Sequence, residues 1–219
     1  MTLNISTPFA YYIGHGTLDF DFTDIRKEER ITWSANQKQA DEFNQEARTL
    51  GLENFHNKYY RILESYPKLR EQITYNFNLF LKHTQGDIRA KISTSWLTYL
   101  EEGENNQKHR HSNCFYSGVL YIDEEYPEGA AVLELENPLP QFHETIIPQH
   151  YAQAVKEDSN NKSLDNLFIK PHKGLYLFFP SHIMHGTVPH KGDPRKSLAF
   201  NFVFDSPIYN FDSTYNPKW

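Results

Sequence analysis

Apolar residues recur at helical intervals through the first third of the chain. Within residues 38–50 and 54–64 they fall three or four positions apart, which is typical of helices with one buried face. Pro67 suits the first turn of a further helix, because the first backbone N–H groups of a helix have no partner within it. The same face then carries Leu69, Ile73, Phe77, Phe80 and Leu81. This pattern predicts a helical part at about residues 36–84, packed on one side of a sheet, after strand-like or irregular pieces at 10–13 and 31–33.

Beyond residue 86 the pattern changes to short apolar runs rich in aromatic and β-branched residues. These runs predict strands at residues 88–100, 115–122, 130–135, 174–179 and 198–204, separated by glycine- and proline-containing turns. Helices followed by antiparallel strands indicate an α+β fold with a double-stranded β-helix core, jelly-roll and cupin-like, at about residues 88–204. Residues 149–167, rich in Asn, Lys, Asp and Ser, form either a lid or a solvated insertion.

Composition narrows the class of protein. The 219 residues are enough for one domain with its own core, so we expect a single domain over residues 1–219. The single cysteine, Cys114, is more typical of a small buried apolar residue than of a ligand. The net charge of −6, without a long run of Lys or Arg, argues against nucleic acid as a partner. No apolar stretch suits a membrane span or a signal peptide, so we expect a cytoplasmic protein; its oligomeric state stays open.

Three histidines suggest a metal site. His109 and His111 are two residues apart before a predicted strand, and side chains at i and i+2 of a strand share one face. A third histidine, His185, follows a later strand and could complete three adjacent positions around a transition metal. One His-x-His pair among eleven histidines is weak evidence. Arg195 and Ser197, on one face of the last strand, add the groups that bind a small carboxylate.

The combination of motifs resembles a known family. The chain contains, in order, Ser95-Trp96, Gly103, His109-Arg110-His111, Ser117-Gly118-Val119-Leu120-Tyr121, Phe179-Pro180-Ser181, His185-Gly186 and Pro194-Arg195-Lys196-Ser197. Over residues 92–204 this order resembles the 2OG-Fe(II) oxygenases of bacteria and phages, double-stranded β-helix dioxygenases related in their core to prolyl hydroxylases.

The resemblance implies a cofactor and a role for each matched residue. His109, His111 and His185 would bind Fe(II), and Arg195 would pair with the far carboxylate of the cosubstrate 2-oxoglutarate. Ser197 and Tyr121 would share that carboxylate, and Tyr99 falls at another active-site tyrosine of the relatives; core packing is the alternative for both tyrosines. Ascorbate is a candidate reductant. Weaker candidates for substrate contacts are Asn113, Asn201 and His182.

One position departs from the wider superfamily, which has Asp or Glu where this chain has His111. Either His111 binds the metal directly, or a carboxylate such as Glu134 or Glu136 completes the site. The two glutamates fit a solvent-facing strand edge better, because they alternate with apolar residues.

The sequence therefore predicts an Fe(II)- and 2-oxoglutarate-dependent dioxygenase that hydroxylates a C–H bond of a small molecule or peptide and releases succinate and carbon dioxide. Two alternatives remain. A cupin-type three-histidine dioxygenase would bind substrate directly to iron and need no cosubstrate, and a non-catalytic jelly-roll module would only bind a ligand. The prime substrate has no signature: a peptidyl proline, a free amino acid or another metabolite would all fit.

Overall fold

Two β-sheets form the core of the computed structural model, which describes residues 11–34, 45, 49–138 and 166–205. In this part of the chain the larger sheet has the strand order β1-β7-β4-β9-β3-β2 and the smaller one the order β6-β5-β8. The strands of the larger sheet are Gly14–Thr17 (β1), Ile31–Ser34 (β2), Ala90–Leu100 (β3), Tyr116–Tyr121 (β4), Leu175–Pro180 (β7) and Arg195–Phe204 (β9). Those of the smaller sheet are Leu133–Glu136 (β5), Asn166–Ile169 (β6) and His185–Thr187 (β8). All pairs are antiparallel except β2 with β3.

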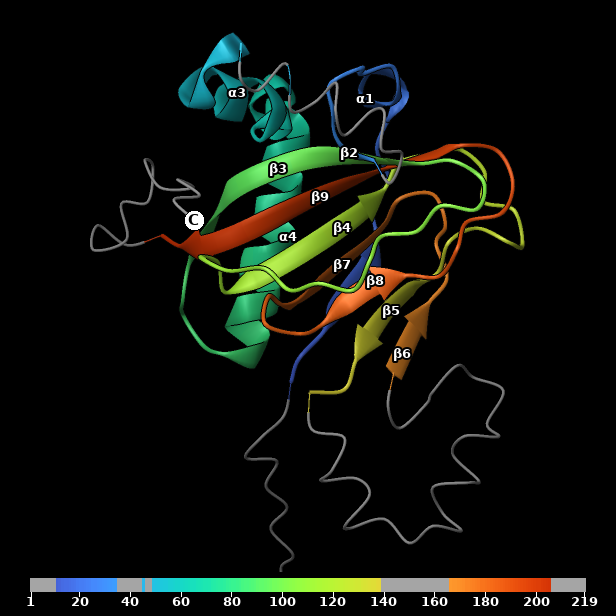
Figure 1. Cartoon of the computed structure of the whole chain (residues 1–219). Helices are drawn as coiled ribbons and strands as arrows, with labels where there is room; N and C mark the ends of the chain where they lie inside the picture. Colours follow the sequence, from blue (N-terminus) through green and yellow to red (C-terminus); the bar gives the residue numbers. More distant parts are fainter. Residues whose placement is uncertain (1–10, 35–44, 46–48, 139–165, 206–219) are drawn as a thin grey trace, which may run out of the picture.

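The helices cover one face of the larger sheet. They are Thr23–Arg26 (α1), Leu52–Tyr59 (α3), the short 3₁₀ helix Ile62–Ser65 (η1) and Pro67–Thr84 (α4). Figure 1 shows α4 against this face, with β5, β6 and β8 on the opposite side of the sheet. One apolar cluster joins α4 to the large sheet, and a second lies around Leu133, Leu177 and Phe179 on the side of the small sheet. The result is the predicted α+β fold with a jelly-roll core.

Helix α4 follows its sequence pattern closely. Proline occupies its first turn, and the residues that the pattern placed on one face are buried at Leu69, Ile73, Phe77 and Leu81. The ring of Phe77 stacks on Phe202 of β9 with 3.7 Å between centroids. Burial of this apolar stripe, rather than helix propensity, holds the helix on the sheet.

An irregularity in β3 decides which side chains face the space between the sheets. Ile92 pairs with Phe202 and Thr94 with Asn201, so Ser93 is an extra residue in the strand. Because side chains alternate along a strand, one extra residue exchanges the two faces. Ile92 before it and Leu97 after it therefore both contact the helix-side core.

Most predicted elements are present. The five predicted strands correspond to β3, β4, β5, β7 and β9, and the second helical pattern corresponds to α3 followed by η1. The sequence pattern did not identify β1, β6 or β8, which have only three or four residues. The predicted helix at 38–50 and the insertion at 149–167 lie mostly outside the described residues; Asn166 and Leu167 of the latter begin β6. Among the helices of the described part, none has the length and apolar character of a membrane-spanning segment.

Candidate active site

His109 and His185 lie side by side because two chain segments pair through their backbones. The His109 N–H donates to the His185 carbonyl (2.8 Å), and the His185 N–H donates to the His109 carbonyl (2.9 Å). Gly186 permits the approach: a Cβ there would lie 2.8 Å from the Asn106 carbonyl oxygen and 3.1 Å from the Lys108 nitrogen. His109 and His111 precede β4, as expected, but their own segment forms an isolated bridge rather than the start of a strand.

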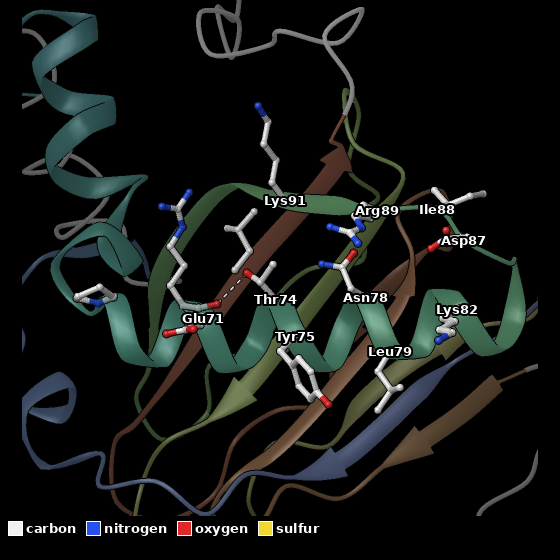
Figure 2. Close-up of a pocket in the computed structure, with 13 residues that line it drawn as sticks. Glu71, Thr74, Tyr75, Asn78, Leu79, Lys82, Asp87, Ile88, Arg89 and Lys91 are labelled. Carbon is white, nitrogen blue, oxygen red and sulfur yellow. Dashed lines mark hydrogen bonds between the residues drawn. The ribbon is translucent and has the colours of Figure 1, made fainter.

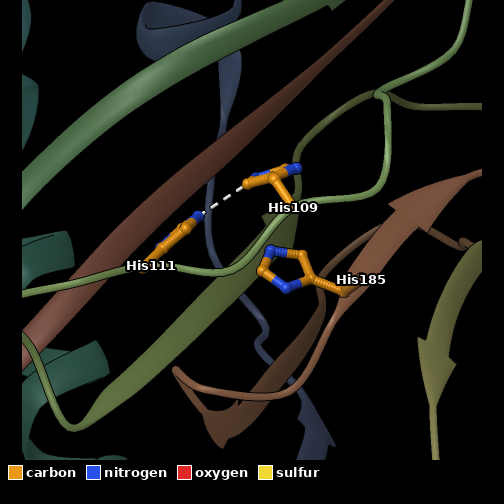
Figure 3. A group of neighbouring side chains, drawn as sticks. All are labelled: His109, His111 and His185. Atoms are coloured by element: carbon orange, nitrogen blue, oxygen red, sulfur yellow. Dashed lines mark hydrogen bonds between the residues drawn. The ribbon is translucent and has the colours of Figure 1, made fainter.

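His111 joins the other two histidines from the same extended segment, where its N–H donates to the Ser181 carbonyl (3.0 Å). One ring nitrogen from each of the three histidines lies within 4.8 Å of the others, and Figure 3 shows the rings facing one another. The Nε2 atoms of His109 and His111 are 3.1 Å apart. The structure thus brings the three sequence-predicted ligands together.

Each of the three histidines has an oxygen acceptor next to its Nδ1 atom. His109 Nδ1 lies 2.7 Å from the Gln107 carbonyl oxygen, His185 Nδ1 lies 2.9 Å from that of Ile183, and His111 Nδ1 lies 2.7 Å from Asn201 Oδ1. An acceptor at Nδ1 keeps the proton on that atom, so the Nε2 lone pair is free to bind a metal. Three neutral imidazoles arranged in this way suit a divalent transition metal such as iron.

Burial favours the neutral form of two of these histidines. It lowers the pKa of His185 to about 3, with the neighbouring His109 and His111 adding to the effect. Burial likewise lowers the pKa of His111 to about 4, against the hydrogen bond to Asn201, which raises it. Both side chains are neutral at pH 7 and need lose no proton to bind a metal. His109 is the exposed member of the group.

A cavity of about 390 Å³ extends from the three histidines to Arg195. The Arg195 side chain is buried, and its Nε and Nη1 atoms have no hydrogen-bond partner among the described residues. Its guanidinium carbon lies 5.4 Å from the centroid of the Tyr121 ring. A buried guanidinium without an acceptor is costly, and a carboxylate accepts two of its N–H bonds in parallel. The end of the cavity at Arg195 therefore suits the carboxylate of a ligand.

Hydroxyl groups surround Arg195 in the same cavity. Ser197 Oγ lies 2.6 Å from Thr98 Oγ1, and both residues line the cavity with Tyr121. Burial raises the pKa of the Tyr121 phenol, against its interaction with Arg195, which lowers it. The phenol therefore stays protonated and can donate to a carboxylate. Sequence reasoning did not identify Thr98, although it is two residues after Trp96 of the quoted motif.

The structure does not bring Tyr99 into the cavity. Thr98 and Trp96 line the cavity, and Tyr99, next to Thr98 along β3, points to the opposite face of the sheet. Asn113 and His182 also lie outside the cavity lining. Both are exposed, and the His182 ring packs on Tyr11 with 5.3 Å between centroids. The structure thus places none of these three residues in the lining of the cavity.

Glu134 and Glu136 do not join the histidines. The Lys108 ammonium group donates to both carboxylates, at 2.9 Å for Glu134 and 2.6 Å for Glu136. Asn166 Nδ2 also donates to Glu134 (2.7 Å). Among the described residues, the group of side chains that could together hold a metal consists of the three histidines alone.

A second hollow, of about 770 Å³, lies on the outer face of α4 beside the start of β3. Figure 2 shows Tyr75, Leu79, Lys82 and Arg89 among its lining residues. Tyr75 is 67% exposed and Leu79 43%. Within the described ranges this hollow contains no group of metal-ligating side chains. The cavity with the histidines is therefore the candidate active site.

A jelly-roll core with three clustered histidines defines a cupin-like fold with a candidate metal site as the class of protein. Residues 94–201 match the model of a family described as "Putative 2OG-Fe(II) oxygenase". This match agrees with the resemblance that the motifs of the sequence indicated. The family name implies Fe(II) and 2-oxoglutarate as cofactor and cosubstrate.

Solved structures of such oxygenases are similar to this chain at low sequence identity. An oxidoreductase of the 2OG-Fe(II) oxygenase family from Burkholderia pseudomallei is 9% identical, with 59% of this chain and 50% of that chain covered and a TM-score of 0.42. The viral collagen prolyl hydroxylase of Paramecium Bursaria Chlorella virus-1 in its 2OG complex is 12% identical, with 62% of this chain and 72% of that chain covered and a TM-score of 0.40. A Pseudomonas putida prolyl-4-hydroxylase is 19% identical, with 60% of each chain covered and a TM-score of 0.38. No curated protein matches the chain.

Proposed function

We propose that the chain is one oxygenase domain that hydroxylates a C–H bond of a small-molecule or peptide substrate, with 2-oxoglutarate as cosubstrate and succinate and carbon dioxide as co-products. The observation that carries this proposal is the buried guanidinium of Arg195. Its unpaired nitrogens lie in the same cavity as the three histidines. A buried cation there calls for an anionic ligand, and in this proposal the ligand is the far carboxylate of 2-oxoglutarate.

Each residue of the cavity has a task in this scheme. His109, His111 and His185 would hold Fe(II) through their Nε2 atoms and leave the remaining positions to ligands from solution. Arg195 would bind the far carboxylate of 2-oxoglutarate, with Ser197 and the protonated Tyr121 phenol as further donors. Fe(II) and 2-oxoglutarate together supply the activation of dioxygen, and ascorbate would keep the iron reduced. The protein contributes the positions of the reacting groups.

The part of the cavity beside His111 would receive the prime substrate. Trp96 and Tyr60 line it, with 6.1 Å between their ring centroids, and Trp96 lies 5.6 Å from the ring of His111. Two aromatic rings form a wall that holds an apolar or planar part of a substrate against the metal.

The test is the binding of 2-oxoglutarate to anaerobic, Fe(II)-loaded protein. We expect a weak visible charge-transfer band when 2-oxoglutarate is added, and slow succinate release when air is admitted. The band should disappear in His185→Ala and Arg195→Ala. His182→Ala is the matched control, because it removes a histidine outside the cavity lining, and it should leave the band unchanged.

The same measurement separates the alternatives. Iron-loaded protein that shows no band and releases no succinate would refute the proposal. Oxygen consumption with a substrate but without 2-oxoglutarate would then point to a three-histidine dioxygenase that needs no cosubstrate. An absence of both reactions would point to a ligand-binding module.

A further inference from the structure

Three neighbouring strands of the large sheet place a hydrogen-bonding chain beside His111. Asn201 of β9 pairs with Thr94 of β3 on one side and with Ser117 of β4 on the other. The extra residue at Ser93 puts Thr94 on the cavity face of β3, two residues before Trp96. Asn201 is 7% exposed. Its carboxamide must therefore find its hydrogen-bond partners within the protein.

The two polar atoms of the Asn201 carboxamide have partners on opposite sides. Its Nδ2 atom donates to Thr94 Oγ1 at 3.1 Å, so its Oδ1 atom faces the other side. There Oδ1 lies 2.7 Å from His111 Nδ1 and accepts from Ser117 Oγ at 2.9 Å. Ser117 Oγ also lies 2.9 Å from His111 Nδ1 and 2.9 Å from Ser181 Oγ. An acceptor fixed at this position requires the His111 proton to be on Nδ1.

We propose that Asn201 is the positioning residue for His111, fixing its tautomer and ring orientation so that Nε2 faces the other two histidines. Thr94 holds the carboxamide in the required orientation. The role of this positioning in metal binding rests on the proposed function.

This arrangement also gives a reason for histidine at position 111. A histidine can donate at Nδ1 to Asn201 Oδ1 and still present a lone pair at Nε2. A carboxylate in the same place would put its oxygen against Asn201 Oδ1, and two acceptors repel each other. The repulsion would be relieved only if the Asn201 carboxamide rotated and gave up its hydrogen bond to Thr94. The surroundings of position 111 are therefore built for an imidazole.

The first test measures the tautomer in metal-free protein, by the ¹⁵N chemical shifts of the His111 ring. We expect Nδ1–H in the wild type and in Asn201→Asp, which keeps an acceptor beside Nδ1. In Asn201→Leu, the Ser117 hydroxyl loses its acceptor Asn201 Oδ1 and can donate to His111 Nδ1 instead, so we expect a shift toward Nε2–H, the tautomer that imidazole prefers in water. This measurement needs neither iron nor activity.

The second test measures the dissociation constant for Co²⁺, which reports on the three-histidine site without oxygen chemistry. We expect binding to weaken by about 10- to 100-fold in Asn201→Leu and to stay close to wild type in Asn201→Asp. Thr94→Val, which removes only the hydroxyl, should weaken binding more than Thr94→Ser, which keeps it. Asn78→Leu is the control for general destabilisation, because Asn78 hydrogen-bonds the backbone of Ala90 on the helix side.

The outcomes distinguish a positioning role from simple packing. Equal losses of affinity in Asn201→Leu and Asn201→Asp would overturn the proposal, and so would an unchanged tautomer in a folded Asn201→Leu protein. If that variant does not fold, equal affinities in Thr94→Val and Thr94→Ser overturn it instead. A wild-type protein that binds no metal would refute the proposed function, while the tautomer measurement would still decide the role of Asn201.

Discussion

At the scale of single residues, Arg195 is the clearest sign of a ligand that the cavity receives. The residue is 4% exposed, yet two nitrogens of its guanidinium lack an acceptor in the described part of the chain. Asp123 interacts with Arg195 electrostatically, but its carboxylate accepts a hydrogen bond from the backbone N–H of Lys196 (2.8 Å). Arg195 is therefore available to bind an anionic ligand that enters the cavity.

Replacing Arg195 should separate cosubstrate binding from metal binding. In Arg195→Gln, we expect the 2-oxoglutarate dissociation constant to rise by about 100-fold or more, because two charge-assisted hydrogen bonds are lost. Arg195→Lys should give a smaller loss, since it keeps the charge but not the forked geometry. Calorimetric titration with 2-oxoglutarate and with Co²⁺ would measure both affinities. Loss of Co²⁺ binding in Arg195→Gln would show that the assigned roles are wrong.

At the scale of elements, the contact between β8 and the segment before His111 places two of the three histidines, His109 and His185. Gly186 lies where a side chain would meet the backbone of Asn106 and Lys108. In Gly186→Ala, we expect the segment to move away from β8, with a loss of stability of about 1–3 kcal/mol and about 10-fold weaker Co²⁺ binding.

Thermal unfolding and Co²⁺ titration would check this expectation. Gly86→Ala is a suitable control, because Gly86 has a φ of +91° and open space around it, so the substitution strains the backbone far from the histidines. If both variants lost stability but neither lost metal affinity, the close approach at Gly186 would not be what places His109.

Sequence patterns predicted the long elements and the motif residues, but not the details of β3. Helix α4 and the strands β3, β4, β7 and β9 have enough apolar residues for their periodicity to be visible, whereas β8 has three residues. The extra residue Ser93 exchanges the faces of β3, and no feature of the sequence announces it. Tyr99 was expected in the cavity from the resemblance to prolyl hydroxylases, whereas the neighbouring Thr98 lines the cavity. Asn201 was expected to meet substrate and instead contacts His111.

At the scale of the whole molecule, Glu28 ties the N-terminal segment to distant parts of the chain. Its carboxylate binds the Arg30 guanidinium and accepts a hydrogen bond from the Tyr66 hydroxyl (3.2 Å). Its carbonyl oxygen accepts from Lys196 Nζ (2.7 Å), next to Arg195 in β9. The hydrogen bond from Arg30 is the main reason that the pKa of Glu28 falls from 4.5 to about 2.

The low pKa of Glu28 predicts part of the acid sensitivity of the fold. Because the pKa is lower in the folded protein than in the unfolded chain, the stabilisation is complete above about pH 5 and is lost as the pH falls toward 2. Glu28→Gln should lower the free energy of unfolding at pH 7 by on the order of 1 kcal/mol and flatten its decline between pH 5 and 2.

Urea unfolding at several pH values would measure this effect. Glu64→Gln is the matched control, since Glu64 pairs with Arg70 at the surface, where its side chain is 51% exposed. Parallel stability profiles for the wild type and Glu28→Gln would exclude the assigned role of Glu28.

The extra residue at Ser93 makes β3 a strand from which one position can be removed. Ile92 and Thr94 face opposite sides and pair with consecutive residues of β9, so a chain without Ser93 would still place every other β3 side chain on its present face. We expect that deletion to leave a folded protein with Co²⁺ affinity near wild type. Deletion of Ser95 instead would also remove the extra position, but it would send Thr94 toward the helix-side core and put Ser93 opposite Asn201. Comparing the two deletions by circular dichroism and Co²⁺ titration would show how far a strand in this fold tolerates a change in length.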